Sequence, residues 1–304
     1  MRLSSNVYTR LKCAALLVSL TSFNLAPAFG LPSKNPLSKD WQLVAESNIV
    51  ARAKIVGDLK KINEMQASKK SDDINLLVAV HEPVKGKVEK NLLTVSEYLG
   101  FDWFARRPSA MGKLVGTEVV VFLVYVDDKS GKGIYFTNRG SSNVRPFNKE
   151  DLLKLKSEVA NQTYIVEHFK EFPIAKQNPS DKKVRSLLSQ LTVDKTQDEA
   201  WEKLLKLPRS DTPALIRAMD DNRTLGHPQI SIPNPPGPHR FEEIAHYGPK
   251  TILDAVSILL GNKTTTSFGQ IYNGGSERER QTVLNAWRVW AYYNLSPGKS
   301  ADSK

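Results

Sequence analysis

The sequence predicts an α+β protein in which a small antiparallel β-barrel comes first and a helical region follows. Short apolar runs rich in β-branched residues, separated by turn residues, occupy residues 40–160. From residue 163 onward, apolar residues recur instead at helical spacing. Without an N-terminal export segment, roughly 275 residues remain, which suits two domains of ordinary size.

The N-terminus has the organisation of that export segment. Arg2, Arg10 and Lys12 precede a mostly apolar stretch at 13–25, and small residues at 26–28 suit a signal peptidase. The apolar stretch is too short and too interrupted to span a bilayer stably. We predict a signal peptide at residues 1–28 and a protein that is periplasmic or extracellular, with no stable transmembrane span after cleavage. An uncleaved membrane anchor is the alternative.

The composition limits the chemistry of the mature chain. Its net charge is +8 instead of +11, because the export segment carries three cations and no acid. A basic protein favours anionic partners, although the excess charge can also serve solubility alone. The single cysteine, Cys13, lies in the export segment. The mature chain therefore has no thiol for a disulfide, a nucleophile or a thiolate metal site.

A short amphipathic helix at 41–47 is predicted to precede the strands. The extended runs follow in the order 49–56, 74–80, 92–95, 118–126 and 134–137. Gly86 breaks the chain between two strands, and the Asp and Gly residues of 127–133 suit a tight reversal. The unbroken apolar run 119–124 predicts a central strand covered on both faces. A helix at 148–159, with Asn148 as N-cap, closes the β-rich domain of residues 40–160.

A helical domain is predicted for residues 163–295. Apolar residues at helical spacing place its helices at 184–191, 200–205, 215–219, 252–260 and 283–293. Trp287, Trp290 and Tyr293 share one helical face and are predicted to pack in the core. Residues 227–248 contain five prolines, which predict a long loop. Residues 296–304 are predicted to be a disordered tail.

Two resemblances follow from these segments. The order of Leu43–Ser47, Ile49–Ala53, Glu82–Gly86 and the run 118–126 resembles the OB-type barrel of netrin-like and tissue-inhibitor-of-metalloprotease-like (TIMP-like) domains, over about 120 residues. The inhibitors of that family present a disulfide-held N-terminal cysteine to the protease zinc. Because the mature chain has no cysteine, inhibition by that route is excluded.

The helical region resembles a degenerate HEAT-like module found in exported bacterial proteins of unknown function. The matching segments are 213–221, 252–261, 268–269 and 286–290. Stacked helix pairs of this kind bury one face and offer another for binding. The resemblance therefore implies protein contact and not catalysis.

One candidate binding segment combines aromatic and basic residues. Trp103, Phe104, Arg106 and Arg107 fall on a predicted loop between strands. Aromatics beside arginine on a barrel loop can stack bases or sugars. The alternative is that the aromatics close one end of the barrel.

One weak candidate metal site comprises His239, Glu243 and His246. If this segment were helical, Glu243 and His246 would share a face at i and i+3, as metal ligands do in helical bundles. Solvated polar residues beside a proline loop are the alternative. His81 and Glu82 are poor acid–base partners, because adjacent strand residues point to opposite faces, and His168 is expected to be structural.

No catalytic signature is present, so we predict a protein that is not an enzyme and needs no cofactor. The leading hypothesis is an exported interaction protein whose partner is another protein in the envelope or outside the cell. A second is a binder of polyanions, such as an acidic glycan or nucleic acid, through the segment 103–107. A third is a metal-dependent enzyme built on His239, Glu243 and His246.

Overall fold

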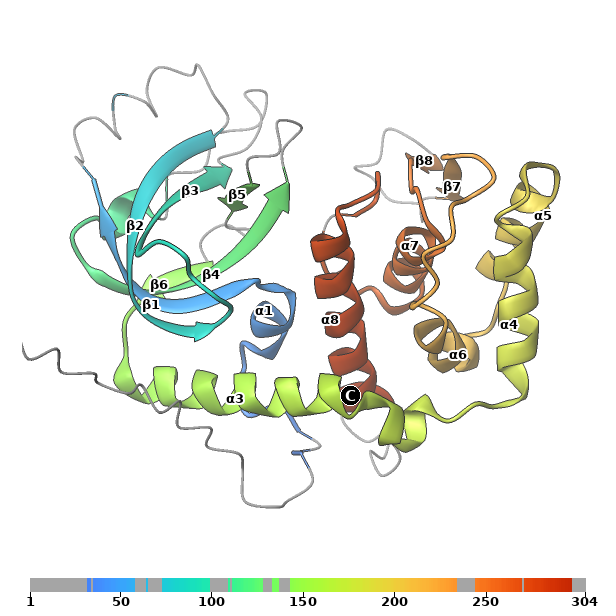
Figure 1. Ribbon diagram of the computed structural model, residues 1–304, viewed down its shortest axis with the longest axis horizontal. Coiled ribbons are helices and arrows are strands. Elements are labelled where there is room, and N and C mark those ends of the chain that lie inside the picture. Colours follow the sequence, from blue (N-terminus) through green and yellow to red (C-terminus); the bar gives the residue numbers. More distant parts are fainter. Residues whose placement is uncertain are drawn as a thin grey trace, which may run out of the picture. The chain divides into compact units, whose positions relative to one another are not determined.

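The computed structural model describes residues 32–33, 35–57, 64, 73–98, 109, 111–127, 133–136, 143–233, 244–269 and 271–296. Within these ranges the strands lie mainly in the N-terminal half and the helices in the C-terminal half (Figure 1), which confirms the α+β class. The predicted signal peptide and the predicted tail from residue 297 lie outside the described residues.

The main sheet has six described strands. They are β1 (Ile49–Val56), β2 (Asp73–Lys85), β3 (Leu92–Tyr98), β4 (Glu118–Asp127), β5 (Gly133–Phe136) and β6 (Val144–Pro146). The hydrogen-bonded order is β1-β2-β3-β5-β4-β6, and β1 also pairs with β4. All these pairs are antiparallel except β3 with β5, which is parallel. The five predicted strands are confirmed, while β6 is not predicted by the sequence pattern.

The predicted break at Gly86 is confirmed. Strand β2 ends at Lys85, and Gly86 has a φ of +79°, a region that residues with a side chain rarely adopt. A Cβ atom at Gly86 would lie 2.1 Å from the backbone oxygen of Asn48. Glycine is therefore required here both by conformation and by space.

Strand β4 is covered on both faces, as its apolar run predicts. Val119, Val121 and Leu123 are fully buried on one face, in a core shared with β1, β2 and β3. Val120 and Phe122 are fully buried on the other face. Successive side chains of a strand point to opposite faces, so an unbroken apolar run needs two layers of cover.

The second layer is provided by α1 (Trp41–Glu46) and α3 (Lys149–Glu167), seen below the strands in Figure 1. Val44 of α1, with Leu152 and Leu155 of α3, packs against β1 and β4. Helix α3 begins with the predicted cap, because the Asn148 side chain accepts hydrogen bonds from two backbone N–H groups. The helix continues without interruption past the predicted domain boundary at 160–163.

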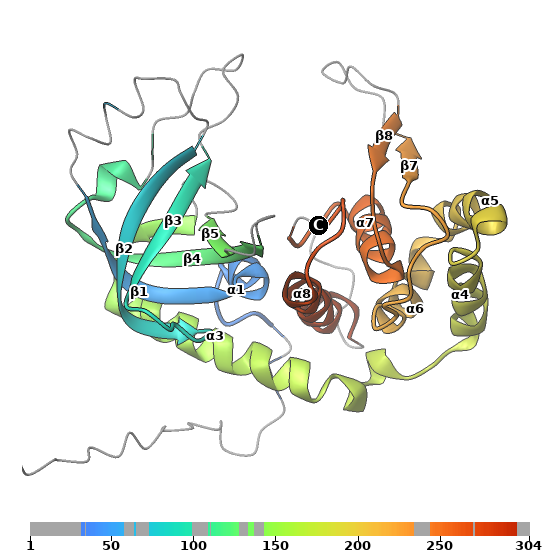
Figure 2. The same ribbon diagram turned by 45° about the horizontal axis from the view of Figure 1, so that its top comes forward.

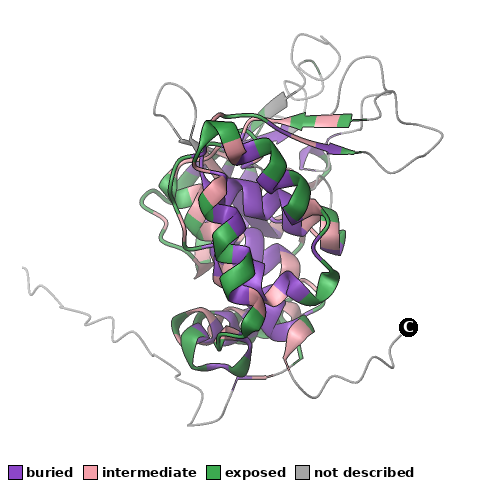
Figure 3. Cartoon of the chain, turned by 90° about the vertical axis from the view of Figure 1, so that its right-hand side faces the viewer, coloured by how far each residue is buried: buried purple, intermediate pink, exposed green. Residues whose placement is uncertain are grey.

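The remaining helices are α4 (Pro179–Gln190), α5 (Asp194–Leu205), α6 (Thr212–Arg217), α7 (Ile252–Thr264) and α8 (Glu277–Leu295). Each matches a predicted helical segment. Their apolar sides form one core, in which Trp287, Trp290 and Tyr293 are buried as predicted. Figure 3 shows buried residues on the sides where helices face each other and exposed residues on the outer sides.

The predicted loop at 227–248 contains regular structure at both ends. Strands β7 (Ile230–Pro233) and β8 (Ile244–Tyr247) form an antiparallel hairpin, visible above α7 in Figure 2. Trp201 of α5 donates a hydrogen bond from its indole N–H to the backbone oxygen of Ser231, at 2.8 Å. Pairing with a partner strand and with α5 stabilises segments that are too short to show a strand pattern in the sequence.

A single buried carboxylate joins three parts of the chain. Glu158 of α3 has no exposed surface. Its Oε2 accepts hydrogen bonds from the backbone N–H groups of Leu37, at 2.6 Å, and Ser38, at 3.2 Å. Its Oε1 accepts from the Gln162 amide and from the Tyr293 hydroxyl, both at 2.7 Å. The Glu158 carboxylate therefore links the segment before α1, helix α3 and helix α8 through hydrogen bonds.

The residues around Glu158 extend this network. Asn161 donates to the Tyr293 hydroxyl at 2.8 Å, and its side-chain oxygen accepts from the backbone N–H of Ser33 at 2.9 Å. The Trp41 ring meets the Tyr293 ring edge-on, with centroids 5.2 Å apart. Burial and the neighbouring Glu158 carboxylate raise the pKa of Tyr293, so its hydroxyl remains a hydrogen-bond donor.

We expect Glu158→Ala to lower the free energy of unfolding by about 3 kcal/mol or more, because it leaves several buried donors without an acceptor. Glu167→Ala, on the exposed side of the same helix, is the matched control and should change it by less than about 0.5 kcal/mol. Urea unfolding followed by circular dichroism measures both. Equal effects of the two substitutions would contradict the role assigned to Glu158.

Candidate functional site

Helices α4 and α5 form a hairpin joined by residues 191–193 and pack against each other at the right of Figures 1 and 2. Their inner sides carry the apolar residues that the sequence places at helical spacing. Val184 and Leu188 of α4 are buried in the same core as Ala200 and Leu204 of α5. The outer sides of both helices remain exposed and carry most of their charges.

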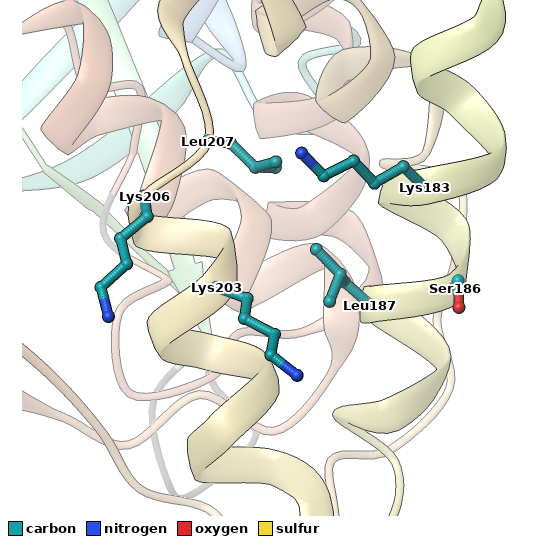
Figure 4. Close-up of a pocket in the computed structure, with 6 residues that line it drawn as sticks. All are labelled: Lys183, Ser186, Leu187, Lys203, Lys206 and Leu207. Carbon is teal, nitrogen blue, oxygen red and sulfur yellow. The ribbon is translucent and has the colours of Figure 1, made fainter.

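An open groove of about 320 Å³ lies between these two helices. Its lining combines cations with apolar groups and consists of Lys183, Ser186, Leu187, Lys203, Lys206 and Leu207. In Figure 4 the Lys183 side chain extends from α4 toward Leu207, and Leu187 points toward α5 above Lys203. Lys206 is directed away from the other side chains.

The two helices supply matching pairs. Lys183 and Leu187 are four residues apart on α4, so they lie on the same face of that helix, one turn apart. Lys203 and Leu207 have the same spacing in the sequence, but Leu207 lies two residues beyond the end of α5 at Leu205. A lysine can lay its aliphatic stem along an apolar floor while its ammonium group stays in water. Sequence reasoning missed this repeated Lys-x-x-x-Leu spacing, which was the available signal.

The lysines of the groove differ in their partners. Lys203 pairs with Glu199 at 2.6 Å and Lys206 with Glu202 at 3.6 Å, both along α5. Such exposed pairs are weak because water and salt screen them, so a ligand can compete for these cations. Lys183 has no ion-pair partner among the described residues. Its ammonium group is the cation most available to a ligand.

The start of α4 is held by a buried ion pair. Asp181 accepts hydrogen bonds from Arg217 Nε at 2.8 Å and Nη2 at 2.9 Å, and from the backbone N–H of Asn178 at 2.6 Å. Both side chains of the ion pair are more than nine-tenths buried. Burial alone would raise the pKa of Asp181, but the hydrogen bonds from Arg217 and Asn178 outweigh it and lower the pKa.

A lysine of α7 stabilises the C-terminal end of α5. Lys263 donates from Nζ to the backbone oxygens of Leu205, at 2.9 Å, and Leu207, at 2.7 Å. A cation at these carbonyl groups satisfies the end of the helix and complements its dipole. Partial burial lowers the pKa of Lys263. The contact with Lys263 therefore fixes the backbone of Leu207, one of the lining residues of the groove.

The predicted binding segment is not placed by the structure. Trp103, Phe104, Arg106 and Arg107 lie outside the described residues. The polyanion-binding role predicted for them stays a prediction.

The helical spacing assumed for the candidate metal ligands is wrong. His239 and Glu243 lie outside the described residues, but His246 lies on strand β8 and not on a helix. Its Nδ1 is 2.9 Å from the Ser231 hydroxyl, and the two residues face each other in the register of the hairpin. In the part of the chain that the structure describes, no group of three His, Cys, Asp or Glu side chains is placed to hold a metal ion.

The other two histidines singled out by sequence have local explanations. The His81 ring has a different partner from its neighbour Glu82: its Nδ1 lies 3.0 Å from Oε1 of Glu118, which also binds Arg52, whereas Glu82 pairs with Lys156. This cluster is on the sheet surface, where its members are about one-third or more exposed. His168 stacks on the Tyr164 ring with centroids 4.1 Å apart, a packing contact that accounts for its position.

We expect Arg217→Met to lower the free energy of unfolding at neutral pH by about 3 kcal/mol, because it leaves a buried charge without its partner. In the native protein the lowered pKa of Asp181 means that this stabilisation is present above the carboxyl's ordinary pKa of about 4 and is lost as the pH falls through the folded-state pKa. The difference between the two proteins should therefore shrink in acid.

Urea unfolding at a series of pH values measures this difference. Arg209→Met, at an exposed arginine before α6, is the control and should leave stability nearly unchanged at every pH. A difference between the Arg217→Met and native proteins that stays constant down to strongly acid pH would contradict the assignment.

In comparison with known proteins, no family model, no curated protein and no solved structure matches the chain. Among the helices in the described ranges, none has the length and apolar character needed to cross a membrane. The α4–α5 groove is thus identified by its own geometry and charge.

Proposed function

We propose that this protein is an exported, non-enzymatic binding protein that docks another protein in the groove between α4 and α5. The observation that carries the proposal is the groove itself, which is open, apolar at its floor and rimmed by lysines. Surfaces that combine apolar contact with charge at the rim are typical of protein–protein interfaces.

The composition of the groove favours binding over catalysis. Its six lining residues include no carboxylate and no imidazole, the usual groups for general acid–base work at neutral pH. Ser186 is the only hydroxyl among them, and no base lines the groove beside it apart from lysine side chains. These residues supply affinity and orientation.

We further propose that the strands form an OB-type barrel similar to that of netrin-like and TIMP-like domains. The pairing of β1 with both β2 and β4 supports this proposal, because the path β1-β2-β3-β5-β4 returns to its first strand. The parallel β3–β5 pair within an otherwise antiparallel arrangement also supports it. A barrel of this kind has no exposed strand edges along that path.

The proposal treats the helical region as a HEAT-like module. Two of its helices, α4 and α7, begin with the same device: a capping box whose aspartate also binds an arginine from a later helix. The pairs are Asp181 with Arg217 and Asp254 with Arg280. Repetition of a local device in successive helix pairs is typical of repeat modules.

Export predicts a defined mature N-terminus. Cleavage after Ala28 should give a secreted or periplasmic chain that begins at Phe29. Mass spectrometry of the protein purified from envelope and culture fractions measures this end. Recovery of a chain that retains Met1 in the membrane fraction would support the anchor instead.

Obstruction of the groove should abolish partner binding. We expect Ser186→Trp, which places a bulky ring on the exposed rim, to remove the retained partner when mature protein is used to pull down from its own envelope extract. Lys182→Trp, on a neighbouring exposed residue of α4 outside the groove, is the control and should retain it. Unchanged partner recovery with Ser186→Trp would overturn the proposed site.

A further inference from the structure

We infer that the groove between α4 and α5 accepts an extended acidic segment of the partner protein, in which an apolar residue stands between two acidic ones. The inference rests on the proposed binding role of this groove and names the chemistry of its occupant. It follows from the charge, the floor, the size and the geometry of the site.

Charge indicates an anionic occupant. Three of the six lining residues are lysines, and no lining residue is acidic. Lys183 has no ion pair within the described ranges, and the partners of Lys203 and Lys206 are exposed glutamates that can turn to solvent. A carboxylate brought beside Lys183 therefore gains an interaction without breaking an existing one.

The floor indicates that charge is only part of the recognition. Leu187 and Leu207 face the groove, and their exposed surface is small because the rest of each side chain is already in the core. A free phosphate or a polyphosphate chain would leave this apolar surface wet. An apolar side chain placed between the two leucines would remove it from water.

The size of the groove limits the occupant to a short segment. A volume of about 320 Å³ is at the lower end of the range of ligand pockets, which is about 300–1,000 Å³. No aromatic side chain lines it. Proteins that bind single-stranded nucleic acid use aromatic side chains to stack the bases, so the lining favours a peptide.

The geometry suggests an extended peptide. Because the two helices are consecutive and antiparallel, Lys183 lies near Leu207, and Lys203 lies near Leu187, at diagonal corners of the groove (Figure 4). In an extended chain, residues i and i+2 point to the same side and are about 6.6 Å apart, while residue i+1 points to the opposite side. Acidic residues on one side of such a chain would face the lysines at the rim of the groove, and the apolar residue between them would face the leucines at its floor.

The test uses fluorescence anisotropy with a synthetic labelled peptide that contains a Glu-Leu-Glu unit between neutral residues, with both ends blocked. Mature wild-type protein should bind this peptide, and Lys183→Glu should weaken binding by about tenfold or more. The control Lys182→Glu makes the same change of charge on a neighbouring exposed residue that does not line the groove. It should change the affinity by less than about twofold.

Two further peptides separate charge from shape. A Glu-Ser-Glu peptide keeps the charge and removes the apolar side chain, and it should bind more weakly than the Glu-Leu-Glu peptide. A Lys-Leu-Glu peptide should bind the wild type poorly and recover affinity with Lys183→Glu. Thermal unfolding of each variant establishes that it is folded before binding is measured.

Three outcomes would overturn the inference: no binding of the Glu-Leu-Glu peptide, equal weakening by both lysine substitutions, or displacement of the peptide by inorganic polyphosphate at matched charge. The last would indicate general attraction to polyanions. None of these outcomes alters the pull-down with Ser186→Trp, so the proposed protein-docking site can stand while this inference fails. Loss of the docking site is recognised separately, by unchanged partner recovery with Ser186→Trp.

Discussion

The burial of Glu158 is the constraint on which the arrangement of the described chain depends. A carboxylate without solvent contact is tolerated only if its oxygens are fully hydrogen-bonded. Here the donors come from the segment before α1, from α3 and from α8, which are brought together only by folding. The same contacts place Trp41 against Tyr293, so α1 is fixed where it covers β1 and β4. One charge thus makes the sheet, its covering helices and the last helix interdependent.

The helical region uses charge in a second, repeated way. Asp181 and Asp254 each complete a capping box at the start of a helix, and each is bound by two nitrogens of an arginine from another helix. The aspartates accept hydrogen bonds from N–H groups at the start of a helix. At the end of α5, Lys263 instead donates hydrogen bonds to backbone oxygens. The contacts of Asp181 and Lys263 fix the start of α4 and the end of α5, the two helices that border the groove. A groove whose walls are held in advance loses less conformational entropy when a ligand binds.

Much of the architecture was predictable because it follows from periodicity. The alternation of side chains explains why the run 119–124 is buried on both faces, and the helical period explains the burial of Trp287 and Trp290. Hairpin β7–β8 was not predictable, because four-residue strands beside prolines acquire their pairing from tertiary contacts. The proposed pairing of Glu243 with His246 assumed a helix, where residues i and i+3 share a face. His246 lies on a strand, where residues three apart point to opposite faces.

By itself, the amino-acid sequence determined most of the strand and helix segments, which of their faces are apolar, and that the chain, with a single cysteine, must be stable without an internal disulfide. These properties are local, because they depend on neighbours within one or two turns or on composition. Only the tertiary structure decided that Glu158 meets Tyr293, 135 residues away, and that the lysines of α4 and α5 share a groove. The reason is physical: a local pattern states that a side chain needs a partner, whereas packing of the whole chain selects which distant residue provides it.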